Sequence, residues 1–103
     1  MTQTKVEKTR FLFELPEHGR LTLTVFVADD YWSYSYYSND GRYERSERQT
    51  LLWANGQIHG AGLSRITECL PQSLHFEVRH LIRQAFIEYR YRLQLEAEAD
   101  ALT

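Results

Sequence analysis

The sequence predicts an α+β protein in which an antiparallel meander sheet of about five to six short strands carries one long C-terminal helix packed across one face. Three observations lead to this prediction. The first two thirds of the chain alternate apolar and polar residues with the two-residue period of strands. Turn-forming residues recur between those segments, so every connection is short and neighbouring strands must be antiparallel. The last third changes to the 3.6-residue period of an amphipathic helix.

The first two strands are predicted from alternation on either side of a turn. Apolar residues alternate through residues 10–15 and again through 21–27. Pro16 and Gly19 lie between these segments and are typical turn residues, so the two segments should form a hairpin.

The third and fourth strands are predicted over residues 31–37 and 42–50. The Ser-Asn-Asp-Gly sequence that joins them contains residues that tolerate the left-handed backbone of a tight turn. The fourth strand alternates arginine with glutamate, which favours an edge or a solvent-facing position. In the third strand, the more apolar face is expected to look toward the core, and it consists of Trp32, Tyr34 and Tyr36.

A further hairpin is predicted around Asn55 and Gly56, which form the strongest two-residue hairpin signal in the chain. The pairing set by this turn places Trp53 opposite Ile58. After a flexible Gly-Ala-Gly connector, residues 63–67 are expected to add one short strand.

The C-terminal helix is predicted to begin with Ser73 as its N-cap after Pro71 and to continue to about Glu98. At about 100° per residue, one apolar set falls within an arc of roughly 140°, which we take as the core face. This set is Leu74, Val78, Leu81, Ile82, Ala85, Phe86, Tyr89 and Leu93. Three carboxylates near the C-terminus lie at the negative pole of the helix dipole, so the last turn should fray.

Length and composition indicate one domain spanning residues 1–103, with 1–8 and 98–103 frayed. The chain is 43% hydrophobic and 25% charged, which is ordinary globular usage and argues against disorder. The single cysteine, Cys69, excludes an intrachain disulfide and is expected to be a small buried residue. No apolar run is long enough for a membrane span, and no signal-peptide stretch is present, so we expect a cytoplasmic protein without membrane partners.

No residue pattern indicates an enzyme. His75 and His80 are five positions apart, so they point in different directions from a helix and cannot bind one metal ion together. Asp29 and Asp30 are adjacent, so a strand would direct them to opposite faces. We therefore expect no catalytic residues, metal, cofactor or small-molecule substrate, and an enzyme of unrecognised type is the least favoured alternative.

A second cluster lies behind the core face of the helix, where a surface helix should be polar. The cluster and the arginines beside it are Phe76, Arg79, His80, Arg83, Ile87, Arg90 and Tyr91. Aromatic residues together with arginine are typical of interface anchors. Three explanations are open: the segment 60–70 folds over this face, the aromatic residues are tolerated at the surface, or a protein partner covers them. We favour a partner, and a symmetric homodimer is the simplest arrangement.

These features predict a small, non-enzymatic protein-binding module. By analogy with other small accessory proteins, it would be a phage or mobile-element inhibitor of a bacterial defence complex, such as a CRISPR-type complex, acting by surface blockade. The alternative is a nucleic-acid-binding accessory protein that uses aromatic residues and arginines of the sheet, although the net charge of -2 argues against a polybasic binder. That surface would consist of Tyr31, Tyr37, Arg42, Arg45 and Arg48.

Overall fold

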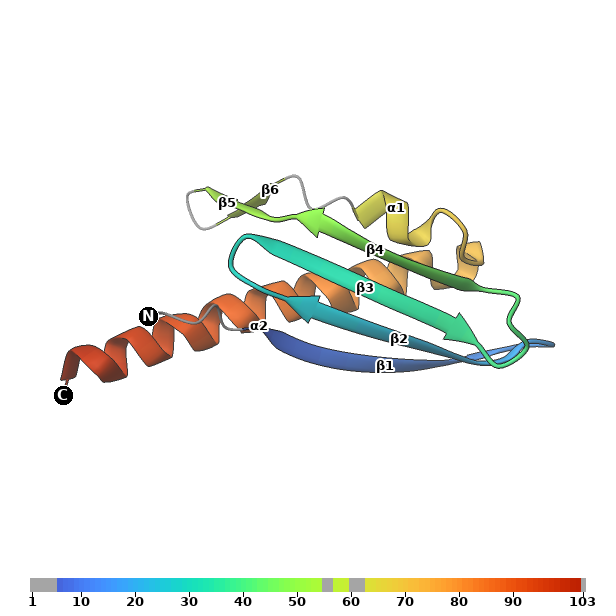
Figure 1. Ribbon diagram of the computed structural model, residues 1–103, viewed down its shortest axis with the longest axis horizontal. Coiled ribbons are helices and arrows are strands. Elements are labelled where there is room, and N and C mark those ends of the chain that lie inside the picture. Colours follow the sequence, from blue (N-terminus) through green and yellow to red (C-terminus); the bar gives the residue numbers. More distant parts are fainter. Residues whose placement is uncertain (1–5, 55–56, 60–62, 103) are drawn as a thin grey trace.

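A computed structural model describes residues 6–54, 57–59 and 63–102 of the chain. Its strands are β1 (Glu7–Leu15), β2 (Gly19–Val27), β3 (Tyr31–Ser38), β4 (Glu44–Thr50), β5 (Leu52–Ala54) and β6 (Gln57–His59). Its helices are α1 (Leu63–Thr67), the 3-10 turn η1 (Gln72–Leu74) and α2 (His75–Leu102). Helix α2 crosses one face of the sheet, and no described element covers the other face (Figure 1). The predicted α+β class with one long C-terminal helix is confirmed.

The main sheet is an antiparallel meander in the order β1-β2-β3-β4. The prediction of five to six strands in this sheet is therefore too high, because β5 and β6 form a separate two-stranded sheet. The register supplies the reason: Thr50 pairs with Tyr31, the first residue of β3. The residues that follow Thr50 have no β3 residue opposite them, so they cannot extend this sheet. Alternation identifies strands and their faces, but it does not identify the partner of a strand.

The hairpin formed by β5 and β6 has the expected register, since Trp53 pairs with Ile58. The predicted central residues of its turn, Asn55 and Gly56, lie outside the described residues.

Residues Leu63–Thr67 form helix α1, so the short strand predicted there is wrong. Leu63, Ile66 and Leu70 are spaced by three and four residues, which places them along one side of a helical turn. Ile66 and Leu70 are buried, and Leu63 packs against the same core. Burial of this side explains why the segment is helical, and five residues are too few for its period to be read reliably beside a glycine-rich connector.

Helix α2 is the longest element and extends further than predicted, to Leu102. Its start also differs, because η1 precedes it and is preceded by Pro71 without a side-chain capping hydrogen bond. Ser73 lies inside that 3-10 turn and is not an N-cap. Strand pairing begins at Glu7 opposite Val27. Fraying of residues 1–8 and 98–103 stays a prediction.

The core lies between α2 and the inner face of the sheet. Trp32, Tyr34 and Tyr36 are buried, which confirms the predicted face of β3. The Trp32 ring contacts the ring of Phe86 edge to face at 5.3 Å between centroids, so β3 and α2 share an aromatic centre. The predicted core face of α2 is confirmed as well. Its fully or nearly fully buried members are Val78, Ile82, Ala85, Phe86 and Tyr89, and its partly buried members are Leu74, Leu81 and Leu93.

Candidate functional site

Three large apolar side chains of α2 point away from the core. The exposed fractions are 79% for Phe76, 53% for Ile87 and 60% for Tyr91. On a wheel of about 100° per residue they fall within roughly 60° of one another, on the side of α2 opposite Val78 and Phe86. We refer to Phe76, His80, Ile87 and Tyr91 as the α2 stripe; within it the His80 ring stacks on that of Phe76.

The segment that could have covered the α2 stripe packs elsewhere. In its described part, 63–70, the side chains of Ile66 and Leu70 turn into the core. Phe76, Ile87 and Tyr91 remain exposed among the described residues.

Two of the three arginines beside the α2 stripe have local partners. Arg90 Nη1 lies 3.5 Å from Asp29 Oδ1, so Arg90 has a counter-charge within its own chain. The helical wheel could not show this contact, because Asp29 belongs to the β2–β3 connection. Arg79 Nε donates to the backbone oxygen of His75 at 3.3 Å. Within the described part of the chain, Arg83 is exposed and contacts no carboxylate.

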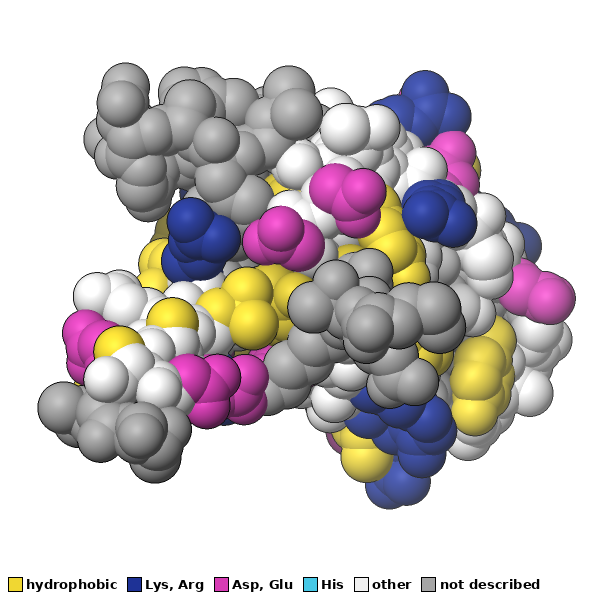
Figure 2. Space-filling view, turned by 60° about the vertical axis from the view of Figure 1, so that its left-hand side comes forward, with side chains coloured by type: hydrophobic (Ala, Val, Ile, Leu, Met, Phe, Trp, Pro, Cys, Tyr) yellow, Lys and Arg dark blue, Asp and Glu magenta, His cyan; other side chains and the backbone are white. Residues whose placement is uncertain are grey.

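The C-terminal part of α2 runs beyond the end of the sheet (Figure 1). A helix of 28 residues is about 42 Å long, whereas a nine-residue strand spans only about 30 Å. Figure 2 shows hydrophobic side chains at the surface of this end, interspersed with acidic and basic ones. The end of the helix therefore presents mixed apolar and charged surface with no described layer above it.

The five residues of the alternative surface are not brought together. Tyr31, Tyr37 and Arg48 lie on the face of the main sheet that α2 does not cover, which we call the open face. Along β3 and β4 they alternate with buried or inward-facing neighbours. Arg45 faces the opposite way, toward α1, and Arg42 lies in the β3–β4 turn. A one-residue offset in a strand reverses the face, so the alternating arginines of β4 cannot act as one patch.

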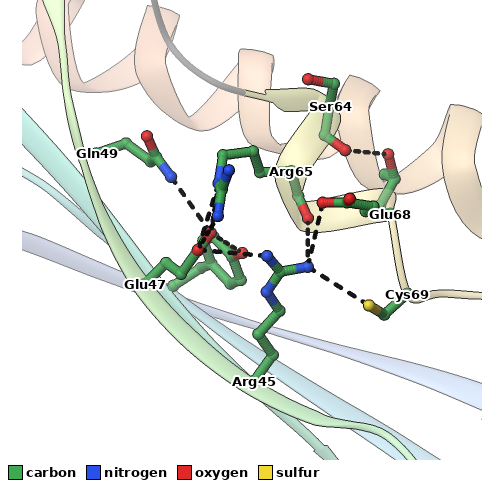
Figure 3. A network of polar contacts seen from close by, with 9 residues as sticks. Arg45, Glu47, Gln49, Ser64, Arg65, Glu68 and Cys69 are labelled. Atoms are coloured by element: carbon green, nitrogen blue, oxygen red, sulfur yellow. Dashed lines mark hydrogen bonds and ion pairs between the residues drawn. The ribbon is translucent and has the colours of Figure 1, made fainter.

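Arg45 instead belongs to a polar network between β4 and α1 that sequence reasoning missed (Figure 3). Its Nη2 lies 3.3 Å from Glu47 Oε1, and its Nη1 donates to the backbone oxygen of Arg65 at 3.0 Å. Arg65 Nη2 lies 2.8 Å from the same Glu47 oxygen, and Tyr34 Oη donates to Glu47 Oε2 at 2.7 Å. The hydrogen bonds from Arg65 and then Tyr34 lower the pKa of Glu47 to about 2. Glu47 is thus an ionised hub that holds α1 against β4.

Cys69 is exposed, so its expected burial is wrong. Its Sγ lies 3.5 Å from Arg45 Nη1, at a cleft that Tyr36, Tyr43 and Arg42 also line. The Tyr36 hydroxyl is buried and has no hydrogen-bond partner among the described residues. Burial raises the pKa of Tyr36. No sequence pattern indicates the exposure of Cys69 or the unpaired hydroxyl of Tyr36. Both depend on where the α1–η1 connection crosses the sheet edge.

No group of three or more histidine, cysteine, aspartate or glutamate residues in the described parts of the chain is arranged to hold a metal ion. Among the described residues, no helix is both long and apolar enough to cross a membrane.

Comparison with known proteins gives no significant match to a family model, a curated protein or a solved structure. The function must therefore be argued from the surfaces described above.

Proposed function

We propose that this protein is a non-enzymatic protein-binding module whose contact surface is the α2 stripe. The exposure of Phe76, Ile87 and Tyr91 on one side of one helix is the observation that supports the proposal. Single exposed apolar residues are common in monomers, but aligned ones beside a cation are typical of contact sites. Burial of each such side chain contributes roughly 1.5–3 kcal/mol.

The occupant that we propose is a second copy of this chain. The stripe has Glu77 and Glu88 along one border and Arg79 and Arg83 along the other, at about 100° per residue. When two such helices pair in parallel, the basic border of one faces the acidic border of the other. Antiparallel pairing would set like charges against each other. A parallel pair also leaves each sheet outside, which gives a four-layer dimer with two helices in the middle.

The sharpest test compares two substitutions of exposed apolar residues by aspartate. Ile87→Asp places a charge in the stripe and should convert a wild-type dimer into a folded monomer. Leu12→Asp makes the same kind of change on the open face of the sheet and should leave the dimer intact. Sedimentation equilibrium over a concentration series measures the association, and circular dichroism confirms that both variants are folded.

A wild-type chain that stays monomeric over that series would contradict the dimer. If Ile87→Asp unfolds while Leu12→Asp does not, the stripe is covered within its own chain and the protein-binding proposal fails. Equal weakening by both substitutions would place the association elsewhere.

The narrower proposal is that the module is a phage or mobile-element inhibitor that blocks a bacterial nucleic-acid-handling defence complex. Its support is size and composition, by class analogy. Expression of the wild-type chain in bacteria that carry such a defence should restore phage plaques, and the Ile87→Asp variant should not. Absence of any restoration by the wild type would reject this target class and leave the α2 stripe as a contact surface.

A further inference from the structure

One register row of the main sheet places two cations and an aromatic ring side by side on the open face. Lys8 pairs with Phe26, Phe26 with Ser33, and Ser33 with Arg48, so one residue from each strand contributes to the row. Strands about 4.8 Å apart make this row about 14 Å long. The two cations therefore lie on the edge strands, and the ring lies between them on a central strand.

The two cations of this row lie against aromatic rings. Among the described residues, Lys8 and Arg48 contact rings and not carboxylates: Lys8 Nζ is 5.9 Å from the Phe26 centroid, and Arg48 Cζ is 3.8 Å from that of Tyr31. Arg10, one position along the same face of β1, likewise has no carboxylate partner within the described part of the chain. Lys8, Arg10 and Arg48 thus place three cations on the open face at this end, although the whole chain carries a net charge of -2. Asp30 of the β2–β3 connection lines a neighbouring hollow together with Tyr31 and Arg48.

The acidic residues that set this net charge lie largely elsewhere. Glu14 points to the open face at the other end of β1 and lies 3.2 Å from Arg20. Much of the remaining negative charge is on α2, which packs on the opposite side of the sheet (Figure 1). This group consists of Glu77, Glu88, Glu96, Glu98 and Asp100. Helix α2 also carries Arg79, Arg83, Arg90 and Arg92, so its five acidic and four basic residues leave it a net charge of -1. The basic character of the open face is therefore local to the cations named above.

A shallow hollow lies in the middle of the row. Phe26, Tyr34, Glu47 and Arg48 line it, together with the serines Ser33, Ser35 and Ser46. The Glu47 carboxylate itself is bound to Arg65 and Tyr34 on the inner side of the sheet. Ser46 Oγ donates to Ser35 Oγ at 3.0 Å. The Ser35 hydroxyl can still donate its own proton and Ser46 Oγ can still accept, so both can hydrogen-bond to the edge of a bound base. A flat ring that entered this hollow would meet the Phe26 side chain, the Arg48 side chain, whose guanidinium lies against the Tyr31 ring, and serine hydroxyl groups.

We infer that the open face is a binding surface for single-stranded nucleic acid. A base stacks on Phe26, the serine hydroxyls contact its edge, and Lys8 and Arg48 neutralise phosphates on either side. Arg10 adds a third phosphate contact from the neighbouring row. These contacts depend on base stacking and phosphate charge, so no strong preference for a particular nucleotide sequence is expected. This surface does not involve the α2 stripe, and its success or failure is independent of the proposed dimer.

Fluorescence anisotropy with labelled ten-nucleotide oligo-dT and oligo-U tests the inference, over a range of salt concentrations. With three phosphates neutralised, the logarithm of the association constant should fall with the logarithm of salt concentration with a slope of about -2. The Lys8→Gln/Arg48→Gln double variant should reduce the slope to about -0.7. Arg42→Gln removes one charge from the far end of the sheet and should leave the slope unchanged.

The aromatic contact is tested separately from the charges. Phe26→Leu keeps an apolar side chain but removes the ring, and it should weaken binding about fivefold or more without changing the salt slope. Phe26→Tyr should retain binding. Thermal unfolding of each variant confirms that the fold is intact.

Three outcomes would overturn the inference. One is the absence of oligonucleotide binding at low salt. Another is binding that Phe26→Leu does not affect and that polyglutamate competes equally well, which indicates a general polyanion surface. The third is duplex DNA bound as tightly as the single strand, since paired bases cannot stack on Phe26.

Discussion

Helices α2 and α1 both lie on the inner side of the main sheet, α2 across its face and α1 beside the β4 edge (Figure 1). The contacts that hold them differ in kind. Helix α2 is attached mainly by apolar burial, with Val78, Ile82 and Phe86 fully buried. Ion pairs at the surface add to it, from Arg92 to Glu7 and from Arg90 to Asp29. Helix α1 buries Ile66 but adds the network of Arg45, Glu47 and Arg65.

This difference separates the responses of the two helices to mutation and to pH. Apolar burial depends on shape and removed water, so the core contacts of α2 should be sensitive to cavities and insensitive to protonation. The attachment of α1 depends on one carboxylate that remains ionised, so it should weaken in acid. The predictions that follow test this contrast, beginning with the largest effect.

The largest effect is expected from a cavity under α2. Ile82→Ala removes part of a side chain that is 0% exposed and should lower the free energy of unfolding by about 2–5 kcal/mol. Leu81→Ala should cost less than Ile82→Ala, because Leu81 is only half-buried. Urea denaturation measures both, with the slope of the unfolding free energy against urea unchanged.

Leu95→Ala is the matched control, since Leu95 lies on the same helix but is exposed. Its effect should be within about 0.5 kcal/mol. If Leu95→Ala costs as much as Ile82→Ala, the core of α2 is not where the structure places it.

The sequence predicted the α2 attachment well and the α1 attachment not at all. The helical period over 74–93 has enough repeats to identify the buried side, and alternation in β3 identified Trp32, Tyr34 and Tyr36. The signal was strong in both cases because many residues share one period. By contrast, α1 has five residues, and its helical form depends on burial of Ile66 by distant parts of the chain.

The candidate surfaces show the same dependence on whether a repeated local pattern exists. The exposure of Phe76, Ile87 and Tyr91 agrees with their place on the predicted helix. The Arg90–Asp29 pair and the row that joins Lys8 to Arg48 depend on register and connection geometry, which no local pattern specifies.

The next largest effect is expected from one of two tyrosines that lie on the same face of β3. Tyr34→Phe removes the hydroxyl that donates to Glu47 and should cost about 1.5–3 kcal/mol, because hydrogen bonds to charged groups are the stronger ones. Tyr36→Phe removes a buried hydroxyl that has no partner among the described residues, and it should be neutral or slightly stabilising. Urea denaturation of the two variants and the wild type gives the comparison. A Tyr36→Phe cost equal to that of Tyr34→Phe would show that the Tyr36 hydroxyl has a partner.

The smallest effect is the acid response of the α1 attachment. The pKa of Glu47 is about 2 in the folded protein and 4.5 for the free side chain, so its stabilisation is fully present above about pH 4.5. It decreases as the pH falls toward 2, because the unfolded chain takes up the proton first. Thermal midpoints of the wild type should therefore fall between pH 5 and pH 2, and Glu47→Gln should fall less steeply.

Asp40 provides the control for this measurement. The backbone N–H of Arg42 and the side chain of His18 lower the pKa of Asp40 to about 2, so Asp40→Asn should also reduce the acid dependence. Asp40 lies in the β3–β4 turn, away from α1. Limited proteolysis at acid pH by a protease active there distinguishes the two sites. Cleavage within the α1 segment should rise in Glu47→Gln and not in Asp40→Asn, because only Glu47 binds Arg65. Equal protection of α1 in wild type and Glu47→Gln would mean that burial of Ile66 alone holds this helix, and the contrast between α1 and α2 would disappear.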